Sequence, residues 1–441
     1  MELKQYNIEP TDENILAALR QDVIGRNTFL SPFLEIIDHS FVSTLALNGD
    51  WGSGKTFFIK QADMLLQWAD DDSGLDIGIR RELDLLIKNE QSALTSPTLS
   101  GPYRAVYYNA WLYDDHNDPI RSLLYFLSIT FNKQYGVCSP KAAELFSGAV
   151  QTLAKWKGVD LDALAKSLWA NDSLKEVKDL ESVKFSLQEA FHDLLGDTYS
   201  LVIFIDELDR CSPAYAVRFL ERVKHFFDCP KVKFVFATNL RQLGAAIQNF
   251  YGANFDSTKY LNKFFDLPVE LPSVSPSTYL LRQGFLQDSH VFQELCAYLI
   301  QYFDFSIRDI NIFLSMADKM RPRINELTNK YWDWKGAYAF SYLFFPPVLA
   351  ALSLDDRTIY HRAVAGLEET LINSIFKGWP EGQTFAEHAF PQTEGNSTSC
   401  VQELVLREYR GIFGSGRVRD DVDSQGTLKS TILNIVSKLY D

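Results

Sequence analysis

Eight consecutive residues, Gly49 to Thr56, constrain the fold of this chain more than any other stretch. They read GDWGSGKT and fill every fixed position of the pattern G-x-x-x-x-G-K-[ST]. A short apolar run at residues 44–47 precedes them, and residues 57–66 after them have helix-forming composition. Strand, loop and helix therefore come in the order that a phosphate-binding loop requires.

The residue types in this loop suit a nucleoside triphosphate. Glycines allow backbone N–H groups to surround a phosphate at the positive end of the following helix. Lys55 is expected to reach the β- and γ-phosphates, and the Thr56 hydroxyl is expected to bind Mg²⁺. The alternative is a glycine-rich turn that contains Lys-Thr by chance. The candidate nucleotide-binding residues are Gly49, Asp50, Trp51, Gly52, Ser53, Gly54, Lys55, Thr56 and Phe57, with Gly25 and Arg26 from an upstream segment that can lie over the adenine.

A second motif makes the chance alternative less attractive. Residues 201–205 are five apolar residues in a row, which predicts a strand buried on both faces, and Asp206 and Glu207 follow them. Asp206 is expected to hold Mg²⁺, and Glu207 is expected to accept a proton from the water that attacks the γ-phosphate. The alternative is an ordinary buried strand that runs into a solvated acidic turn.

A third predicted strand covers residues 232–237 and is followed by Asn239. A polar side chain at the end of a strand beside the acidic one can orient the attacking water or sense the γ-phosphate, and Asn239 is our candidate for that role. The alternative is a cap for the helix expected to begin at Leu240. The two roles are compatible.

Composition sets the class and the compartment. A chain of 441 residues that is 46% hydrophobic is long enough for two or three packed domains. The net charge of −14 opposes general attraction to nucleic acid or anionic membranes. Five cysteines without C-x-x-C spacing argue against a disulfide framework or zinc site, and no secretory signal is visible, so a cytoplasmic location is expected.

The most apolar segment, residues 340–352, is shorter than a membrane span and contains two prolines. We predict a buried helix pair with a break there, and no membrane span. A strand is predicted at residues 105–111, with Asn109 and Trp111 near its end. We expect a nucleotide-binding core at 1–272 with a mainly helical insertion at about 112–196, followed by a C-terminal helical domain at 273–441.

Several stretches together resemble the KAP P-loop NTPases, a branch of the additional-strand NTPases. The resemblance spans about residues 22 to 314, and the tryptophan in the loop and the run Asp-Glu-Leu-Asp-Arg at 206–210 make it specific. It rests on residues 22–26, 49–56, 108–111, 205–211, 260–263 and 307–311. It implies an α/β fold with a parallel P-loop NTPase sheet of the additional-strand type flanked by helices, and a helical insertion between the two motifs; the all-helical C-terminal domain is predicted from the sequence pattern alone.

The resemblance also implies an activity. The core would bind ATP with Mg²⁺ and hydrolyse it, with the catalytic glutamate directly on the acidic strand, as Glu207 is. Arg308 resembles a second sensor that reaches back to the γ-phosphate; its alternative is a surface arginine. Arginine-finger candidates are Arg210, Arg218 and Arg222. Bacterial relatives are often linked with exclusion of bacteriophage, which implies antiviral defence, with self-association or other defence-system proteins as partners.

Three functions follow for comparison. The first is an ATPase that acts as a switch or effector module, and the second is a nucleotide-gated oligomeric scaffold with slow turnover. The third is a nucleic-acid motor or clamp, for which residues 319–323 and 407–419 offer basic stretches in an otherwise acidic chain. Small kinases share the loop but would need a phosphate-acceptor pocket in place of a water-activating glutamate.

Overall fold

The structure is a computed structural model that describes residues 9–116, 118–135, 144, 148, 173–227, 229–286, 290–331, 336–390, 398–414 and 422–439. Much of the predicted insertion, at residues 136–172, lies outside the described residues apart from two positions. Residues 391–397 and 415–421 also lie outside the described residues.

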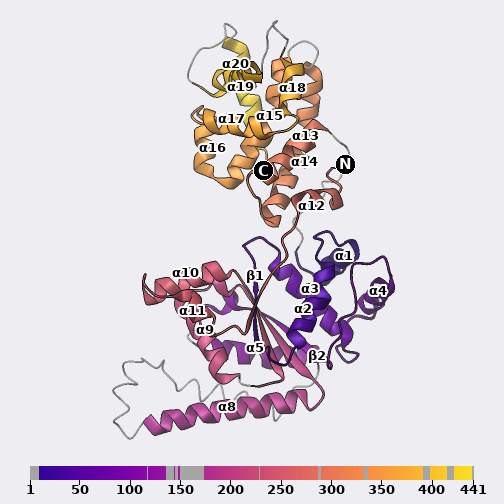
Figure 1. Ribbon diagram of the computed structural model, residues 1–441, viewed down its shortest axis with the longest axis vertical. Coiled ribbons are helices and arrows are strands. Elements are labelled where there is room, and N and C mark those ends of the chain that lie inside the picture. The colour runs from indigo at the N-terminus through magenta and orange to yellow at the C-terminus, as the bar shows by residue number, and fades with distance from the viewer. Residues whose placement is uncertain are drawn as a thin grey trace. The chain divides into compact units, whose positions relative to one another are not determined.

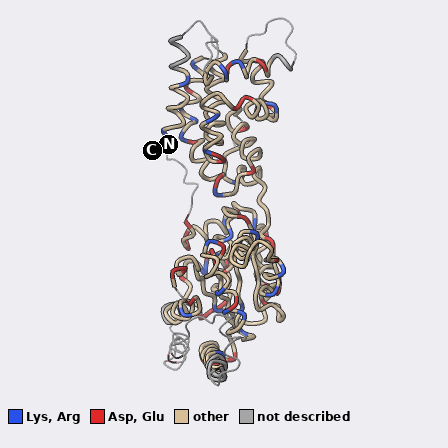
Figure 2. The backbone as a smooth tube through the Cα atoms, turned by 90° about the vertical axis from the view of Figure 1, so that its left-hand side faces the viewer, with Lys and Arg blue, Asp and Glu red and all other residues tan. Residues whose placement is uncertain are grey.

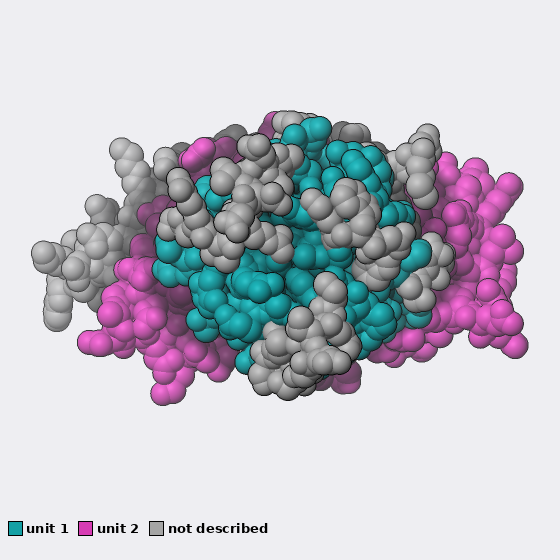
Figure 3. Space-filling model, turned by 90° about the horizontal axis from the view of Figure 1, so that it is seen from above, with its two compact units in different colours: residues 1–9, 274–441 teal, residues 10–273 magenta. Residues whose placement is uncertain are grey.

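The chain divides into two compact units, which Figure 3 colours separately. The first unit, Pro10–Ser273, contains every strand described here, and we call it the sheet unit. The second unit comprises Met1–Glu9 and Val274–Asp441; its described elements are all helices, and we call it the helical unit. Each unit is described by itself below.

The sheet unit is built on five parallel strands in the order β2-β3-β4-β1-β5. The three inner strands, β3, β4 and β1, are almost wholly buried, as their apolar runs predict. The strands are β1 (Thr44–Asn48), β2 (Tyr103–Asn109), β3 (Ser200–Asp206), β4 (Val232–Thr238) and β5 (Leu267–Glu270). The predicted parallel α/β sheet is therefore confirmed.

Helices cover both faces of this sheet (Figure 1). One face packs on α1 (Asp12–Gln21), α2 (Asn27–Asp38), α3 (Lys55–Ala69) and α4 (Ile77–Lys88). The other packs on α5 (Pro119–Tyr135), α8 (Ser173–Leu195), α9 (Pro213–Phe226), α10 (Leu240–Tyr251) and α11 (Ser257–Leu261). Neighbouring residues of one strand enter opposite cores, since Ile203 belongs to the second and Phe204 to the first.

The strand register places the polar strand ends in one row. Asn109 of β2 lies opposite Asp206 of β3, which in turn lies opposite Ala237 of β4. On the other side of β4, Thr238 lies opposite Asn48 of β1. Because all strands run in the same direction, their carboxyl ends meet along one edge of the sheet, where open α/β sheets bind their ligands.

β2, the strand that separates the two motifs in the sequence, lies at the edge of the sheet, and β4 is inserted between β1 and β3 in space. One detail of the strand predicted at residues 105–111 is wrong. Trp111 is not on β2, which ends at Asn109; it lies in the short 3₁₀ helix η1 (Ala110–Tyr113). The Asn109 side chain accepts a hydrogen bond from the Trp111 N–H, which ends the strand and starts that turn.

The helical unit packs around one central helix, α15, which contacts α13, α14, α16, α18 and α20. Its helices are α12 (Pro276–Arg282), α13 (Val291–Tyr302), α14 (Ile307–Tyr331), α15 (Gly336–Asp355), α16 (Arg357–Val364), α17 (Glu369–Gly378), α18 (Gly382–Ala389), α19 (Thr398–Phe413) and α20 (Val422–Ser437). The expected all-helical character of this part of the chain is confirmed for its described residues.

The predicted break in the apolar segment is wrong, because α15 runs through Pro346 and Pro347 as one helix. Each interior proline costs about 3 kcal/mol or more in an isolated helix. Residues 339–353 are all buried, and their packing in the unit offsets that cost. Among the described helices, only α15 is long and apolar enough to cross a membrane, and 83% of its most apolar window is buried inside the structure.

Candidate nucleotide site

The loop between β1 and α3 has the geometry of a phosphate cradle. Gly52 and Gly54 have φ angles of 77° and 89°, in the left-handed region that favours glycine. At position 49 a Cβ would lie 2.9 Å from the Ser53 hydroxyl oxygen, so a larger residue there would displace that hydroxyl. That oxygen is buried and has no hydrogen-bond partner. A phosphate oxygen would supply the missing partner, so the loop fits the group that its sequence predicts.

Lys55 starts α3 and turns back over the loop. Its ammonium donates hydrogen bonds to the carbonyl oxygens of Gly49 and Asp50, at 2.7 and 3.1 Å. The residue is buried, and burial lowers the pKa of Lys55 below its ordinary value, while the nearby carboxylates of Asp209, Asp206 and Asp50 oppose that shift. These three acidic groups therefore favour the positively charged form of Lys55 at the phosphate-binding loop.

Thr56 and Asp206, the two predicted Mg²⁺ ligands, are in direct contact. The Thr56 hydroxyl donates to Asp206 Oδ2 at 2.6 Å, and the Tyr107 hydroxyl donates to the same oxygen at 3.0 Å. Asp206 is almost fully buried, and burial raises the pKa of its carboxyl although these hydrogen bonds oppose the shift. Hydroxyl and carboxylate oxygens are the ligands that Mg²⁺ prefers, so this pair fits the ion.

Glu207 follows directly and has a strained backbone, with a φ of 60° that is uncommon for a residue with a Cβ. Its two carboxylate oxygens have different partners. Oε1 lies 3.0 Å from Arg210 Nη1 in an ion pair, and Oε2 accepts a hydrogen bond from Asn109 Nδ2 at 3.1 Å. Asn109, which lies at the end of β2 opposite Asp206, thus helps to hold the Glu207 carboxylate in place.

Asn239 directly follows β4, and both polar atoms of its side chain have partners. Its Oδ1 accepts from the Gln242 N–H at 3.1 Å, which caps α10. Its Nδ2 donates to Asp50 Oδ1 at 3.1 Å, which joins it to the phosphate-binding loop. Capping therefore leaves the amide nitrogen available to the site.

Two upstream candidates lie in the turn before α2. Gly25 has a φ of 76°, as a tight turn requires. The Arg26 guanidinium donates to the carbonyl oxygens of Ser53 and Pro272, at 2.7 and 2.8 Å. Burial lowers the pKa of Arg26 to about 10. The structure thus places Arg26 against the back of the loop, where it supports the Ser53 backbone.

The remaining candidates divide between the two units. Phe57 is half-buried and packs against the core shared by α2 and α3. Arg308 is exposed on α14 and belongs to the helical unit, whereas the other candidates belong to the sheet unit. Of the arginine-finger candidates, Arg210 pairs with Glu207, whereas Arg222 pairs with Asp118 at 3.6 Å.

Two residues of the site were not among our candidates. Tyr107 reaches Asp206, and it lies two positions before Asn109 on β2, so strand alternation places both on one face. That spacing was a usable signal. Asp209 is nearly buried and accepts hydrogen bonds from the Trp51 indole and the Asn239 backbone N–H. In the sequence, Asp209 is distinguished only by its position in the run Asp-Glu-Leu-Asp-Arg at 206–210.

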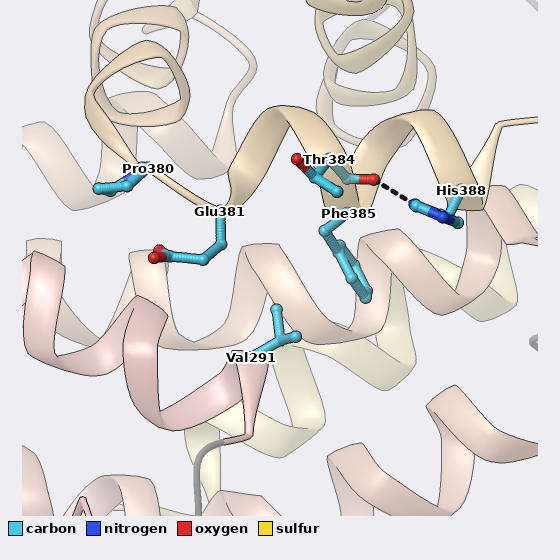
Figure 4. A pocket seen from close by; sticks show the side chains of 6 residues that line it. All are labelled: Val291, Pro380, Glu381, Thr384, Phe385 and His388. Carbon is cyan, nitrogen blue, oxygen red and sulfur yellow. Dashed lines mark hydrogen bonds between the residues drawn. The ribbon is translucent and has the colours of Figure 1, made fainter.

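A pocket of about 460 Å³ lies in the helical unit (Figure 4). The Phe385 side chain extends toward Val291, and His388 Nδ1 pairs with the carbonyl oxygen of Thr384 at 2.7 Å. The lining residues are Val291, Pro380, Glu381, Thr384, Phe385 and His388. None of the nucleotide-site candidates belongs to it, so it is separate from the chemistry described above.

The fold and the loop define a nucleotide-binding P-loop protein. The family described as "KAP family P-loop domain" matches residues 26–288, which is more than half of the chain, and the chain belongs to this family. Among solved structures, it is similar to "Structure of C. elegans PCH-2", with 12% sequence identity, 91% of this chain and 70% of that chain covered, and a TM-score of 0.21. A TM-score this low says nothing about function. No curated protein matches the chain.

Proposed function

We propose that this protein binds ATP with Mg²⁺ at the Gly49–Thr56 loop and hydrolyses it, as a switch or effector module. The observation that carries the proposal is the contact between Thr56 and Asp206, at 2.6 Å, with Glu207 next in the chain. A hydroxyl and a carboxylate that suit Mg²⁺ thus lie beside a second carboxylate that suits water activation.

The chain's own groups divide the work. Loop N–H groups and the start of α3 bind the phosphates, and Lys55 exchanges the carbonyl oxygens of Gly49 and Asp50 for phosphate oxygens. Thr56 and Asp206 would hold the Mg²⁺, which neutralises charge on the phosphates. Asn239 Nδ2 lies at the loop, where it can orient a water or a phosphate oxygen.

Glu207 would accept the proton of the attacking water. Both of its oxygens have protein partners in this structure, Arg210 and Asn109. Each carboxylate oxygen has a second lone pair, so a water can donate a hydrogen bond to Glu207 while both contacts hold it in place. The described arrangement therefore orients the base and leaves it able to accept a proton.

Release of phosphate from Mg·ATP without an added acceptor tests the activity and counts against a kinase. Wild type should release phosphate, Glu207→Gln should bind ATP but release phosphate at least about 100-fold more slowly, and Lys55→Ala should bind ATP poorly. Glu326→Gln is a matched control, because Glu326 pairs with Arg323 at the same i,i+3 spacing as Glu207 and Arg210. Equal release by wild type and Glu207→Gln would refute the assigned role.

The ion pair of Glu207 with Arg210 favours a second candidate, a nucleotide-gated oligomeric scaffold with slow turnover, because protonation of Glu207 would break that ion pair and so slow the proton transfer. In that case ATP binding holds an assembly together, and hydrolysis only ends it. Sedimentation of the full chain with Mg·ATP separates the two. The scaffold requires ATP-dependent assembly that persists in Glu207→Gln along with cellular function, whereas the switch requires that function be lost in this variant.

A role in defence against bacteriophage rests on the family resemblance alone and has its own test. Cells that express wild type, Lys55→Ala or Glu207→Gln would be infected with a panel of phages. Defence predicts fewer plaques with wild type than with either variant or an empty vector. Equal counts in all four would end this proposal and leave the ATPase proposal untouched.

Nucleic acid is the least favoured partner. Basic and acidic positions are intermixed along the backbone of both units (Figure 2), and the net charge is −14. A motor or clamp would show DNA or RNA binding that weakens steeply as salt rises. We expect no binding even at low salt.

A further inference from the structure

Asp209 joins three parts of the sheet unit through one oxygen. Its Oδ2 accepts a hydrogen bond from the Trp51 indole Nε1 at 2.7 Å and another from the Asn239 backbone N–H at 3.0 Å. Trp51 belongs to the phosphate-binding loop, Asn239 follows β4, and Asp209 lies in the short 3₁₀ helix η2 (Leu208–Arg210) after β3. The carboxylate is nearly buried, so water competes poorly for these two donors.

Asp50, another variable position of the loop, is attached to the same segment. Asp50 Oδ1 accepts from Asn239 Nδ2 at 3.1 Å, and the neighbouring Leu240 N–H donates to Asn48 Oδ1 at 2.9 Å. Asn48 and Asp50 are therefore hydrogen-bonded directly to the segment that follows β4, and Trp51 is connected to it through Asp209. These positions do not belong to the fixed pattern of the loop, so the pattern itself does not explain their contacts.

The exposure of the Trp51 ring shows that its hydrogen bond to Asp209 is not a by-product of core packing. About half of its surface, 47%, is exposed, although a large apolar ring gains most when it is buried. Its polar edge is the part that has a specific partner. The hydrogen bond, more than apolar burial, therefore fixes the position of this side chain.

We propose that Asp209 is a positioning residue that presets the nucleotide loop by holding the Trp51 indole. This inference rests on the proposed ATP binding and adds a residue that acts through the loop. Without the anchor, the backbone between Gly49 and Gly54 must be ordered when nucleotide binds, and that ordering reduces affinity. The arrangement also keeps the carboxylate of Asp209 close to Lys55, whose positive charge it favours.

The test is equilibrium binding of a fluorescent ATP analogue, with Mg²⁺, to the full chain and its variants. Trp51→Phe keeps an aromatic ring and removes the N–H, and we expect it to weaken binding about fivefold to tenfold, the size of effect expected for one net hydrogen bond. Asp209→Ala should weaken binding at least as much. The double variant should bind no more weakly than Asp209→Ala alone, because both changes remove the same contact.

Two further variants separate positioning from general stability. Trp68→Phe is the matched control: its indole donates to Asp84 Oδ1 at 3.0 Å, near the opposite end of α3, and binding should be unchanged. Asp209→Asn retains an oxygen that can accept both hydrogen bonds, and should recover most of the affinity that Asp209→Ala loses. If Asp209→Ala does not fold, Trp51→Phe against Trp68→Phe decides the question.

The outcomes are distinct. Wild-type affinity in Trp51→Phe, or effects of the two single changes that multiply in the double variant, would overturn the role of Asp209 while leaving ATP binding intact. Absence of binding by wild type would instead overturn the proposed function and this inference with it. A coupled loss with rescue by Asp209→Asn supports the anchor.

Discussion

Thr56 and Asp206 are 150 residues apart in the sequence, yet their side-chain oxygens lie 2.6 Å apart. A threonine hydroxyl at this position can be a metal ligand, whereas Ala offers no oxygen. We expect Thr56→Ala to require about tenfold more Mg²⁺ for half-maximal ATPase rate, a loss of about 1.4 kcal/mol. Thr56→Ser, which keeps the hydroxyl, should remain within about twofold of wild type in the same Mg²⁺ titration. Identical Mg²⁺ requirements in Ala and Ser variants would exclude Thr56 as a ligand.

Asp63 on α3 is a half-buried residue outside the nucleotide site, with a buried carboxyl oxygen. Its Oδ1 has no hydrogen-bond partner, and burial raises the pKa of Asp63 to about 6, against the influence of Gln67 and Lys60. Because this pKa lies above the unfolded value of about 3.9, the ionised form costs stability above pH 6 and the cost disappears as the pH falls below the unfolded value.

Asp63→Asn should therefore raise the free energy of unfolding at pH 7.5, by about 1–3 kcal/mol. The gain should lie near the lower end of this range, because part of the surface of Asp63 is exposed to solvent. Most of the gain should be absent at pH 4. Urea unfolding of both proteins at the two pH values measures it, and an equal gain at both would show that ionisation is not the cause.

At the scale of elements, contiguous patterns predicted the sheet well. The apolar runs of β1, β3 and β4 and the loop before α3 are local signals, and each specifies its own structure. Contacts between distant segments were not predictable in the same way. Asp209 meets Trp51 across 158 positions, and only the strand register brings those two segments together. The continuity of α15 through two prolines also depends on tertiary packing, which local propensity does not contain.

The same helix gives the element-scale prediction. Phe344 on α15 is fully buried, with Phe340 and Trp379 stacked on it at ring distances of 5.3 and 6.0 Å. Phe344→Ala should lower the free energy of unfolding of the helical unit by about 3–5 kcal/mol, because it removes apolar contacts and leaves a cavity. Leu367, which is 66% exposed in the same unit, provides the control, and Leu367→Ala should cost less than about 0.5 kcal/mol. Comparable losses in urea unfolding would contradict the central place of α15.

At the scale of the whole molecule, we propose that the sheet unit and the helical unit are separate folding domains, since each has its own internal contacts and its own buried apolar residues, those of α15 in the helical unit. Calorimetry of the full chain should show two unfolding transitions. Mg·ATP at about 100 times its Kd should raise one of them by roughly 5–10 °C and leave the other in place. A single transition, or an equal shift of both, would mean that the two units unfold together.

A single-turnover experiment tests the central claim most directly, because it reports binding and cleavage at once. Protein in excess is mixed with γ-labelled ATP and Mg²⁺, and bound ATP and free phosphate are followed over time. Wild type should bind the ATP and convert it to phosphate, Glu207→Gln should retain it uncleaved, and Lys55→Ala should capture little of it. Wild type that binds no ATP, or that leaves bound ATP as intact as Glu207→Gln does, would contradict the assignment of the Gly49–Thr56 loop, Asp206 and Glu207 as a hydrolytic site.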